Sequence, residues 1–503
     1  MSFKSTIRLI LNRMYCPFIN IINNVISSYH GLSLPAKAAI WYTFCNFFNK
    51  AVALLSTPIF TRIMSTEQYG AFAVFQSWFS ILSIFTSLNI FLSCYTKGLI
   101  KYKDDKDNLT SSLFSLTTFI TILFMIIYGM NIGFWTNFFN LHPILMAAMF
   151  IELITYPAYN FWITRKRLDN KYRSVVLYSI LMNIICISTS AIAVIFSTNK
   201  LEARIFSDVG VKVLFALPIV IAIIYKGKKI INTKYWKYAL SFNLPLIPHF
   251  LSHFVLNQSD RIMIGKMVGD SQAGFYSVSY TIATILNLLV TAINDSLMPS
   301  IFKALDSNNM KRIIKIKQII TPLSIVIAIL CVLLTLFAPE IITVFAGNQY
   351  LDAIYIIPPV AASVYFYYIY SLFSHIEYYH QQTKKIAFAS IISAALNIIL
   401  NYVAISLFGY IAAGYTTLAC YILLAIMHYL FYKKLIQKHY NNNDIYNNRL
   451  LFTIGVFLSI LSIIILPIYN ITILRYILIV ITIIVILVFR NKFIKTLKLL
   501  QEK

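Results

Sequence analysis

Fourteen apolar spans, each about 20 residues long, follow one another between residues 36 and 489 and constrain the fold more than any motif. A helix of this length crosses the hydrocarbon core of a bilayer. Hydrophobic residues make up 59% of the 503-residue chain and charged residues only 12%, too few to cover a soluble protein of this size. The sequence therefore predicts an all-α integral membrane protein with about 14 transmembrane helices.

Lysine and arginine are distributed unevenly among the connections between these spans. Most of the 42 lie in the two terminal segments and in every second connection, whereas the other connections hold only a few, including Arg62 and Arg261. Because positively charged connections stay in the cytoplasm, both termini are predicted to be cytoplasmic. The formal net charge of +25 is then mainly a signal of topology, with some attraction to anionic lipid, and no nucleic-acid partner is expected.

The first 35 residues form a basic amphipathic segment. Lys4, Arg8 and Arg13 alternate with apolar residues that recur every three or four positions. We expect a helix that lies on the cytoplasmic membrane surface. The segment lacks the unbroken apolar core and the small-residue cleavage site of a signal peptide.

Six cysteines are scattered along the chain without a CxxC pair, which indicates neither a disulfide framework nor a metal site. The chain also contains no GxxxxGK[ST] phosphate-binding loop, so it carries no ATPase of that kind. We expect no cofactor and no catalytic residue.

A sequence repeat divides the chain into two similar halves. Thr61–Gly70 aligns without gaps on Gly265–Gly274, and the alignment keeps a cation, a glutamine and a glycine in step. The second copy lies within Asn243–Asp295, which is predicted to form two membrane-length helices joined by a polar turn from Asp260 to Gly274.

The helices that follow these turns carry matching polar stripes. A spacing of 4, 3 and 4 residues places each stripe on one face of a helix. The first stripe consists of Gln76, Ser80, Ser83 and Ser87, and the second of Tyr280, Thr284, Asn287 and Thr291. The stripes either line a cavity or hold helices together through hydrogen bonds.

The repeats predict a division of the chain into five parts, two of them parallel six-helix bundles around a central cavity. An even number of crossings separates the repeats, and such parallel repeats are one known transporter plan. The parts are an amphipathic segment (1–35), an N-terminal bundle (36–225), a basic linker (226–237), a C-terminal bundle (238–432), and two additional helices with a basic tail (433–503).

The repeated turns resemble known signatures. Pro58–Gly70 is similar to the segment after the first helix of the polysaccharide flippases (Wzx-like), within the multidrug/oligosaccharidyl-lipid/polysaccharide exporter superfamily. Asp260–Gly265, continuing to Gly274–Tyr276, resembles the signature that opens their second half. The resemblance implies a multi-pass transporter of the bacterial inner membrane rather than an enzyme.

The same resemblance implies a substrate and a pathway. Members of the family flip undecaprenyl-pyrophosphate-linked oligosaccharides to the outer leaflet by alternating access without ATP, for O-antigen, lipopolysaccharide or other surface polysaccharide assembly. Expected partners are this lipid-linked oligosaccharide, membrane lipids, and a polysaccharide polymerase with its chain-length regulator.

Cations at membrane depth are candidates for binding the pyrophosphate. Lys50 lies inside the first span, on one face with Asn46, and Lys212 lies inside the sixth span. A charge at the bilayer centre costs at least about 2.5–3.5 kcal/mol, which favours a water-filled cavity around these lysines. The alternative for Lys212 is an ion pair with Asp208. Arg62 and Arg261, in the two repeat turns, are further candidates.

Titratable groups inside the spans are candidates for ion coupling. Glu152 either carries a proton or pairs with Lys50 or Lys212 across the bundle. His249 and His253 share a stripe with Asn257, and histidine as a residue type titrates near neutral pH, although a hydrogen bond to a neighbouring helix is the simpler role. The full set of coupling candidates is Glu152, Asp208, His249, His253 and Asp295.

The tenth span is rich in tyrosine. Tyr367, Tyr370 and Glu377 share one face and are candidates for contact with sugar rings, although tyrosine is also common at membrane interfaces.

Two other function classes compete with a flippase. A MATE-type exporter of small molecules, coupled to protons or sodium, fits the two bundles but leaves the unpaired cations unexplained, since these would repel cationic drugs. A membrane-embedded polymerase or acyltransferase is disfavoured, because the outer connections are short and no accessible HxxxxD pair is present.

Overall fold

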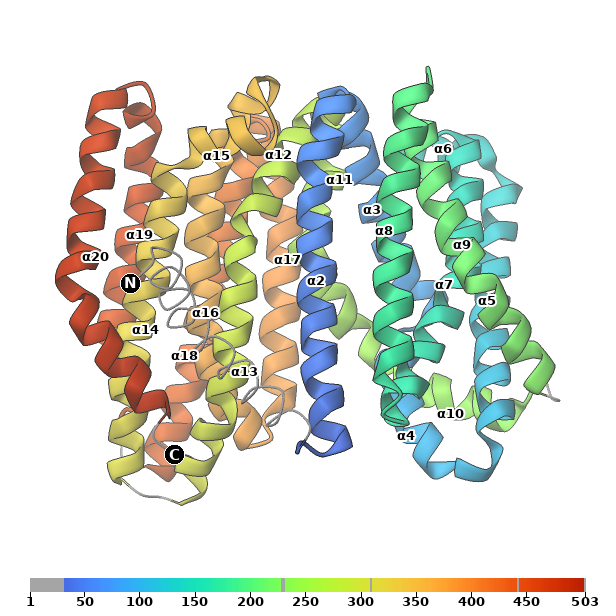
Figure 1. The fold of residues 1–503 in the computed structure, drawn as a ribbon, viewed down its shortest axis with the longest axis horizontal. Coiled ribbons are helices and arrows are strands. Elements are labelled where there is room, and N and C mark those ends of the chain that lie inside the picture. Colours follow the sequence, from blue (N-terminus) through green and yellow to red (C-terminus); the bar gives the residue numbers. More distant parts are fainter. Residues whose placement is uncertain (1–30, 228–230, 308–309, 441–442, 502–503) are drawn as a thin grey trace, which may run out of the picture.

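The computed structural model describes residues 31–227, 231–307, 310–440 and 443–501, and within these ranges every regular element is a helix. The predicted amphipathic segment therefore lies almost wholly outside the described residues. Twelve of the described helices are long and apolar enough to cross a membrane. Two more, α2 (Leu34–Ile63) and α20 (Thr472–Gln501), run alongside them over the same height of the bundle (Figure 1). The predicted all-α membrane fold is confirmed.

The N-terminal half of the chain folds into one group of helices, which we call the N-lobe. Its helices pack through α7 on α9, α8 on α9 and α2 on α8. After α2 it contains α3 (Thr66–Ser87), α4 (Cys94–Lys101), α5 (Lys106–Met130), α6 (Ile132–Phe139), α7 (Pro143–Leu168), α8 (Tyr172–Phe196) and α9 (Lys200–Lys226).

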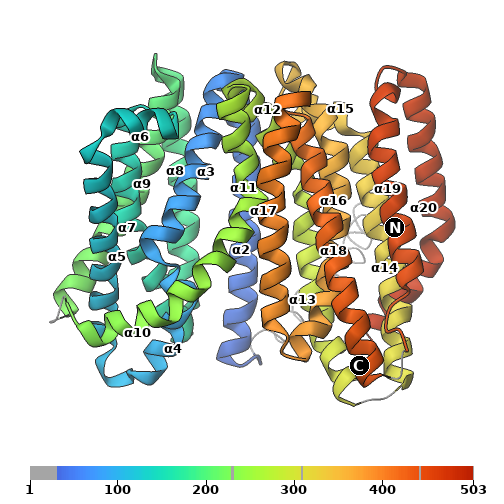
Figure 2. The same cartoon turned by 180° about the vertical axis from the view of Figure 1, so that it is seen from behind.

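The C-terminal half forms a second group, the C-lobe, on the other side of α2 (Figures 1 and 2). Its centre is α16, which packs on α18, α14 and α13, while α19 and α20 cover the outer side of α14. The C-lobe contains α11 (Ile247–Met267), α12 (Asp270–Ala283), α13 (Ile285–Asp306), α14 (Met310–Leu336), α15 (Ala338–Phe345), α16 (Ile357–Tyr379), α17 (Thr383–Phe408), α18 (Ala412–His439) and α19 (Asn448–Ile468).

The seventh predicted span is bent rather than straight. Pro245 lies in a short 3-10 turn that separates α10 (Thr233–Asn243) from α11, and proline at such positions breaks the helical hydrogen-bond ladder. The α10 helix packs against α4 and α5, with the Trp236 indole nitrogen donating to the Ser112 carbonyl over 2.8 Å. The connection between the repeats is thus fastened to the N-lobe.

The polar turn of the second repeat is shorter than the sequence predicts. The prediction started it at Asp260, but α11 continues as a helix to Met267, so Asp260 and Arg261 lie inside α11. Only Val268 and Gly269 separate α11 from α12, and Gly269 adopts a φ of 142°, which glycine tolerates. In the first repeat, Ser65 and Gln68 form a capping box at the start of α3.

One apolar core is shared by both lobes. Val74, Phe75 and Trp78 of α3 belong to the same buried cluster as Ile262 of α11 and Tyr276 of α12. This cluster lies at the end of the molecule where the two repeat turns meet, the junction end (Figure 1). The opposite end, which carries α4 and α10, is called the basic end. The positive-inside rule predicts that the basic end is cytoplasmic.

Candidate functional site

The two repeated turns contact each other directly. Gly70 of α3 lies so close to α12 that a Cβ atom on it would overlap the carbonyl oxygen of Asp270 and come within 2.7 Å of the Gly274 nitrogen. A Cβ atom on Gly274 would in turn lie 2.5 Å from the Thr66 carbonyl oxygen. The glycines that the sequence alignment paired are therefore packed backbone to backbone, and neither position can hold a larger residue in this conformation.

Hydrogen bonds across the lobes surround this glycine contact. The Thr66 hydroxyl donates to the Ser271 hydroxyl over 3.2 Å. About two helical turns beyond Gly70 on α3, the Ser77 hydroxyl donates to Gln258 Oε1 over 3.2 Å. The Arg62 guanidinium donates to the Val344 carbonyl, at the end of α15, over 2.7 Å. We call this set of contacts the lobe junction.

Arg261 lies next to the lobe junction on α11. Its guanidinium donates to Gln258 Oε1 over 2.6 Å and to the Ser277 hydroxyl over 3.2 Å, and its charge lies 4.9 Å from the centre of the Tyr280 ring. Within the described chain no carboxylate lies within ion-pair distance of Arg261. The direct partners of this half-buried cation are therefore neutral polar groups.

Lys212 is paired in the structure. Its ammonium lies 2.8 Å from Glu152 of α7 and 2.7 Å from Asp208 one turn earlier on α9, and Gln76 of α3 donates to Asp208 over 3.5 Å. Glu152 is 2% exposed. The sequence offered two ion pairs for Lys212, one with Asp208 and one with Glu152, and both are present. We call these three residues the charged triad; it has two carboxylates for one ammonium.

Lys50 and Asn46 lie on the exposed face of α2, and neither ion pair nor hydrogen bond is formed by the Lys50 side chain within the described residues. The neighbouring Asn49 faces the other way and accepts from Asn183 of α8 over 2.9 Å. The α2 helix contacts α8 of the N-lobe and α12 and α15 of the C-lobe, so Lys50 lies on the helix at the seam between the lobes (Figure 1).

Some side chains of the polar stripes form hydrogen bonds within their own helices. Ser80 and Ser87 donate to carbonyl oxygens of the preceding turn, as does Thr291 in the second stripe. Tyr280 reaches across to α11 and donates to Asn257 Oδ1 over 3.0 Å. Ser80, Thr284 and Asn287 remain half-buried, while Ser83 and Ser87 are buried. The stripes thus combine helix-to-helix contacts with a few accessible polar groups.

The histidine and aspartate candidates of the C-lobe are dispersed. His253 and Asp295 are exposed on different helices, α11 and α13, and His249 is half-buried with its Nδ1 atom unpartnered. These residues do not form one cluster with Glu152 and Asp208, which lie in the N-lobe. They stay separate candidates for ion coupling.

The tyrosine-rich helix is mostly internal. Glu377 is fully buried and its Oε1 lies 2.7 Å from Nδ1 of His428 on α18. Tyr370 stacks on the His428 ring at 5.3 Å, and Tyr367 packs against Tyr421. Tyr367 and Tyr370 stay half-buried. Glu377 therefore lies inside the C-lobe against His428 in this conformation, and a sugar contact at this position stays a prediction.

A buried carboxylate in the C-lobe was not among the predicted site residues. Asp260 is fully buried and accepts hydrogen bonds from the Tyr276 hydroxyl, the Asn401 amide and the Thr417 hydroxyl, the last over 2.9 Å. Asn397 extends the network by accepting from Asn401 over 3.1 Å. All of these partners are neutral. The sequence shows Asn397 and Asn401 one turn apart on an apolar helix, which is the signal that could have indicated this network.

The comparisons with known proteins agree with this architecture. The model of the family described as polysaccharide biosynthesis protein matches residues 36–305, more than half of the chain. The chain belongs to this family. A second family model, MatE, matches residues 245–403 within the C-terminal repeat.

Relatives of this family member are distant. A protein of Escherichia coli K12 named "Putative O-antigen transporter" is 22% identical over 393 residues, which cover 76% of this chain and 93% of the relative. An "Uncharacterized membrane protein" of Haemophilus influenzae is 23% identical over 363 residues, covering 69% of this chain and 84% of the relative.

Solved structures show the same fold. The lipid II flippase MurJ in an inward closed conformation matches with a TM-score of 0.68 at 16% identity, covering 90% of this chain and 99% of MurJ. An inward-facing multidrug resistance MATE family transporter matches with a TM-score of 0.57 at 13% identity, covering 78% of this chain and 96% of the transporter. The chain is a multi-span membrane protein of a transporter family.

Proposed function

We propose that this protein flips undecaprenyl-pyrophosphate-linked oligosaccharides across the bacterial inner membrane by alternating access, for O-antigen or another surface polysaccharide. The family and the "Putative O-antigen transporter" relative support the polysaccharide pathway. The observation that carries the transport mechanism is the lobe junction, where two repeats meet through Gly70 and Gly274 at one end of the molecule.

The lobe junction is suited to opening and closing. Its central contact is between backbones, and two of its surrounding bonds join hydroxyl and amide groups, each contributing only about 1 kcal/mol. The third bond, from Arg62 to the Val344 carbonyl, is exposed. Such a contact can separate without leaving a buried charge. Alternating access then consists of parting the lobes at the junction end while they approach at the basic end.

Two cations on the route can meet the pyrophosphate. Lys50 is exposed on α2, the helix between the lobes, and Arg261 lies beside the lobe junction without an ion-pair partner in the described chain. Because arginine and lysine bind phosphate oxygens through charge-assisted hydrogen bonds, we assign these two side chains to the head group. In this conformation Lys212 is bound by two carboxylates, and Arg62 is hydrogen-bonded across the lobe junction. We therefore assign both side chains to stabilising the protein rather than to binding the head group.

We also propose that transport is coupled to a cation through Asp260. A fully buried carboxylate surrounded only by neutral donors is stable when it takes up a proton or holds a cation, because an isolated buried charge is costly. Asp260 adjoins Arg261, so a change of its charge is felt at the lobe junction. The polymerase and the chain-length regulator remain proposed partners.

A MATE-type exporter is the second candidate, because the MatE model matches the C-terminal repeat. Reconstitution separates the two. The full-length protein in proteoliposomes is given a fluorescent undecaprenyl-pyrophosphate-linked oligosaccharide, and a membrane-impermeant glycosidase reports its appearance in the opposite leaflet. We expect flipping of the glycolipid and no uptake of a cationic dye. Dye transport without glycolipid flipping would contradict the proposal.

A further inference from the structure

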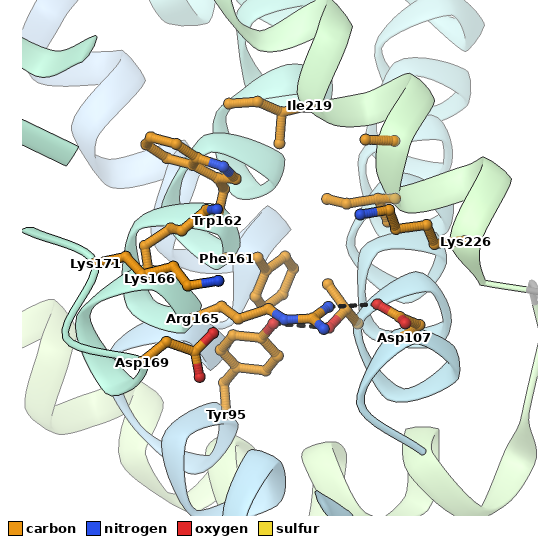
Figure 3. A pocket seen from close by; sticks show the side chains of 13 residues that line it. Tyr95, Asp107, Phe161, Trp162, Arg165, Lys166, Asp169, Lys171, Ile219 and Lys226 are labelled. Carbon is orange, nitrogen blue, oxygen red and sulfur yellow. Dashed lines mark hydrogen bonds and ion pairs between the residues drawn. The ribbon is translucent and has the colours of Figure 1, made fainter. Parts of the chain in front are cut away.

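A pocket of about 230 Å³ opens in the N-lobe at its basic end, away from the lobe junction. Tyr95 of α4, Asp107 of α5, Trp162 and Arg165 of α7, and Ile219 of α9 are among the residues that line it (Figure 3). The function proposed above makes no use of this pocket.

The floor of the pocket is cationic. The lining includes two carboxylates, Asp107 and Asp169, and four cations, Arg165, Lys166, Lys171 and Lys226. Asp107 is bound to Arg165 over 2.5 Å. Figure 3 shows Lys166 and Lys226 pointing toward the space from opposite sides. In the described chain, no carboxylate lies within ion-pair distance of Lys166, Lys171 or Lys226. The Arg165–Asp107 pair holds the floor in place and leaves three ammonium groups unpaired.

The wall of the pocket is apolar and aromatic. Trp162 stacks against Tyr159 at 6.3 Å between ring centres, and Ile219, Ala222 and Ile223 of α9 continue the wall. Ala222 is exposed on the outer surface of α9. Tryptophan at the end of a membrane span marks the level of the lipid head groups. The pocket thus has a charged floor on the water side and an apolar wall on the lipid side.

We propose that this pocket binds the phosphate head group of an anionic phospholipid from the leaflet at the basic end. Basic pockets between transmembrane helices on the cytoplasmic side recognise such head groups. The phosphate would lie among Lys166, Lys171 and Lys226, while an acyl chain follows Ile219 and Ile223 along α9. Lysines that only set the membrane topology do not have to lie close together, whereas these three lysines line one pocket.

Lipid binding to the purified full-length protein tests this site. Native mass spectrometry measures retention of short-chain phosphatidylglycerol and, for comparison, of zwitterionic phosphatidylcholine. The pocket variant is Lys166→Gln with Lys226→Gln. The matched control is Lys434→Gln with Lys438→Gln, which removes the same charge from exposed positions of α18 at the basic end.

We expect the pocket variant to bind phosphatidylglycerol about 30-fold more weakly, about fivefold for each lysine removed, and phosphatidylcholine binding to stay unchanged. The control should lose less than about threefold. Equal losses in pocket variant and control, or none in either, would overturn the proposal.

Two further probes separate the sources of phosphate. Inorganic phosphate that displaces phosphatidylglycerol only at high concentration supports a site for an intact lipid. Undecaprenyl pyrophosphate that binds the native pocket in preference to phosphatidylglycerol would overturn the assignment to a phospholipid in favour of the transported lipid.

Discussion

The two lobes share one repeat but treat their buried carboxylates differently. In the N-lobe, Glu152 and Asp208 share the ammonium of Lys212. In the C-lobe, Asp260 is surrounded by neutral hydroxyl and amide donors. The N-lobe carboxylates are therefore held by an opposite charge, whereas Asp260 can gain or lose charge without breaking an ion pair. The N-lobe thus carries a charge cluster that is paired internally, and the coupling proposed above is assigned to the C-lobe carboxylate that lacks an opposite charge.

The largest expected effect is in the N-lobe. Lys212→Gln leaves two carboxylates close together without a counter-charge, and we expect a loss of about 3–5 kcal/mol in the free energy of unfolding. Thermal unfolding in detergent measures it. The triple variant that adds Glu152→Gln and Asp208→Asn should recover most of the loss. Failure of this rescue would show that Lys212 acts through contacts other than the triad.

The contact between the lobes should show the next largest effect. Gly70→Ala places a methyl group against the Asp270 carbonyl, and overpacking of this kind costs about 1–3 kcal/mol of the closed junction. Disulfide formation in Thr66→Cys with Ser271→Cys reports closure, and Gly70→Ala should slow it. Gly129→Ala is the control, because a Cβ atom there meets nothing within 4 Å. Equal cross-linking in both variants would mean that the glycines do not set the contact.

A smaller stability effect is expected for Asp260→Asn. The amide keeps most of the hydrogen bonds, so we expect a loss of about 1–2 kcal/mol in the free energy of unfolding. Glycolipid flipping should nevertheless lose its dependence on a proton or sodium gradient. Asp352→Asn, at an exposed position of the same lobe, should keep that dependence. Gradient-driven flipping by Asp260→Asn would instead move the coupling role to Glu152, Asp208, Asp295 or a histidine.

An ion pair whose carboxylate is half-exposed sets the lower end of the scale, although its arginine, Arg475, is only 6% exposed. Burial raises the pKa of Glu340, but hydrogen bonds from Arg475 and Tyr476 outweigh this and leave the pKa below its usual value. Arg475 and Glu340 lie 2.5 Å apart, and the Glu340 side chain is 34% exposed. Such a pair contributes stability above the pKa of the unfolded chain and loses it as the pH falls through the folded pKa.

Glu340→Gln should therefore lower the free energy of unfolding by about 0.5–1 kcal/mol at pH 7. The difference from the native protein should fade below about pH 4. Thermal unfolding across this range measures the change. A difference that persists in acid would show that the substitution acts through packing rather than through charge.

The spacing of apolar residues predicted much of the fold, whereas the same kind of pattern predicted few of the side-chain contacts in the candidate site. The apolar spans and the alignment of Gly70 with Gly274 follow from sequence spacing alone. The pairing of Glu152 with Lys212 joins residues on different helices, and the burial of Glu377 against His428 depends on how α16 packs on α18. Spacing along one helix cannot encode which neighbour a side chain meets, and that is why Asp260 was also missed.

A reversible lock at the lobe junction tests the central claim most directly. The hydroxyl oxygens of Thr66 and Ser271 lie 3.2 Å apart, so cysteines at these positions can form a disulfide, and the native cysteines of the described chain are buried. In proteoliposomes, oxidation of Thr66→Cys with Ser271→Cys should stop the flipping of undecaprenyl-pyrophosphate-linked oligosaccharide, and reduction should restore it. Flipping at the native rate while the disulfide is intact would contradict transport by opening of this junction.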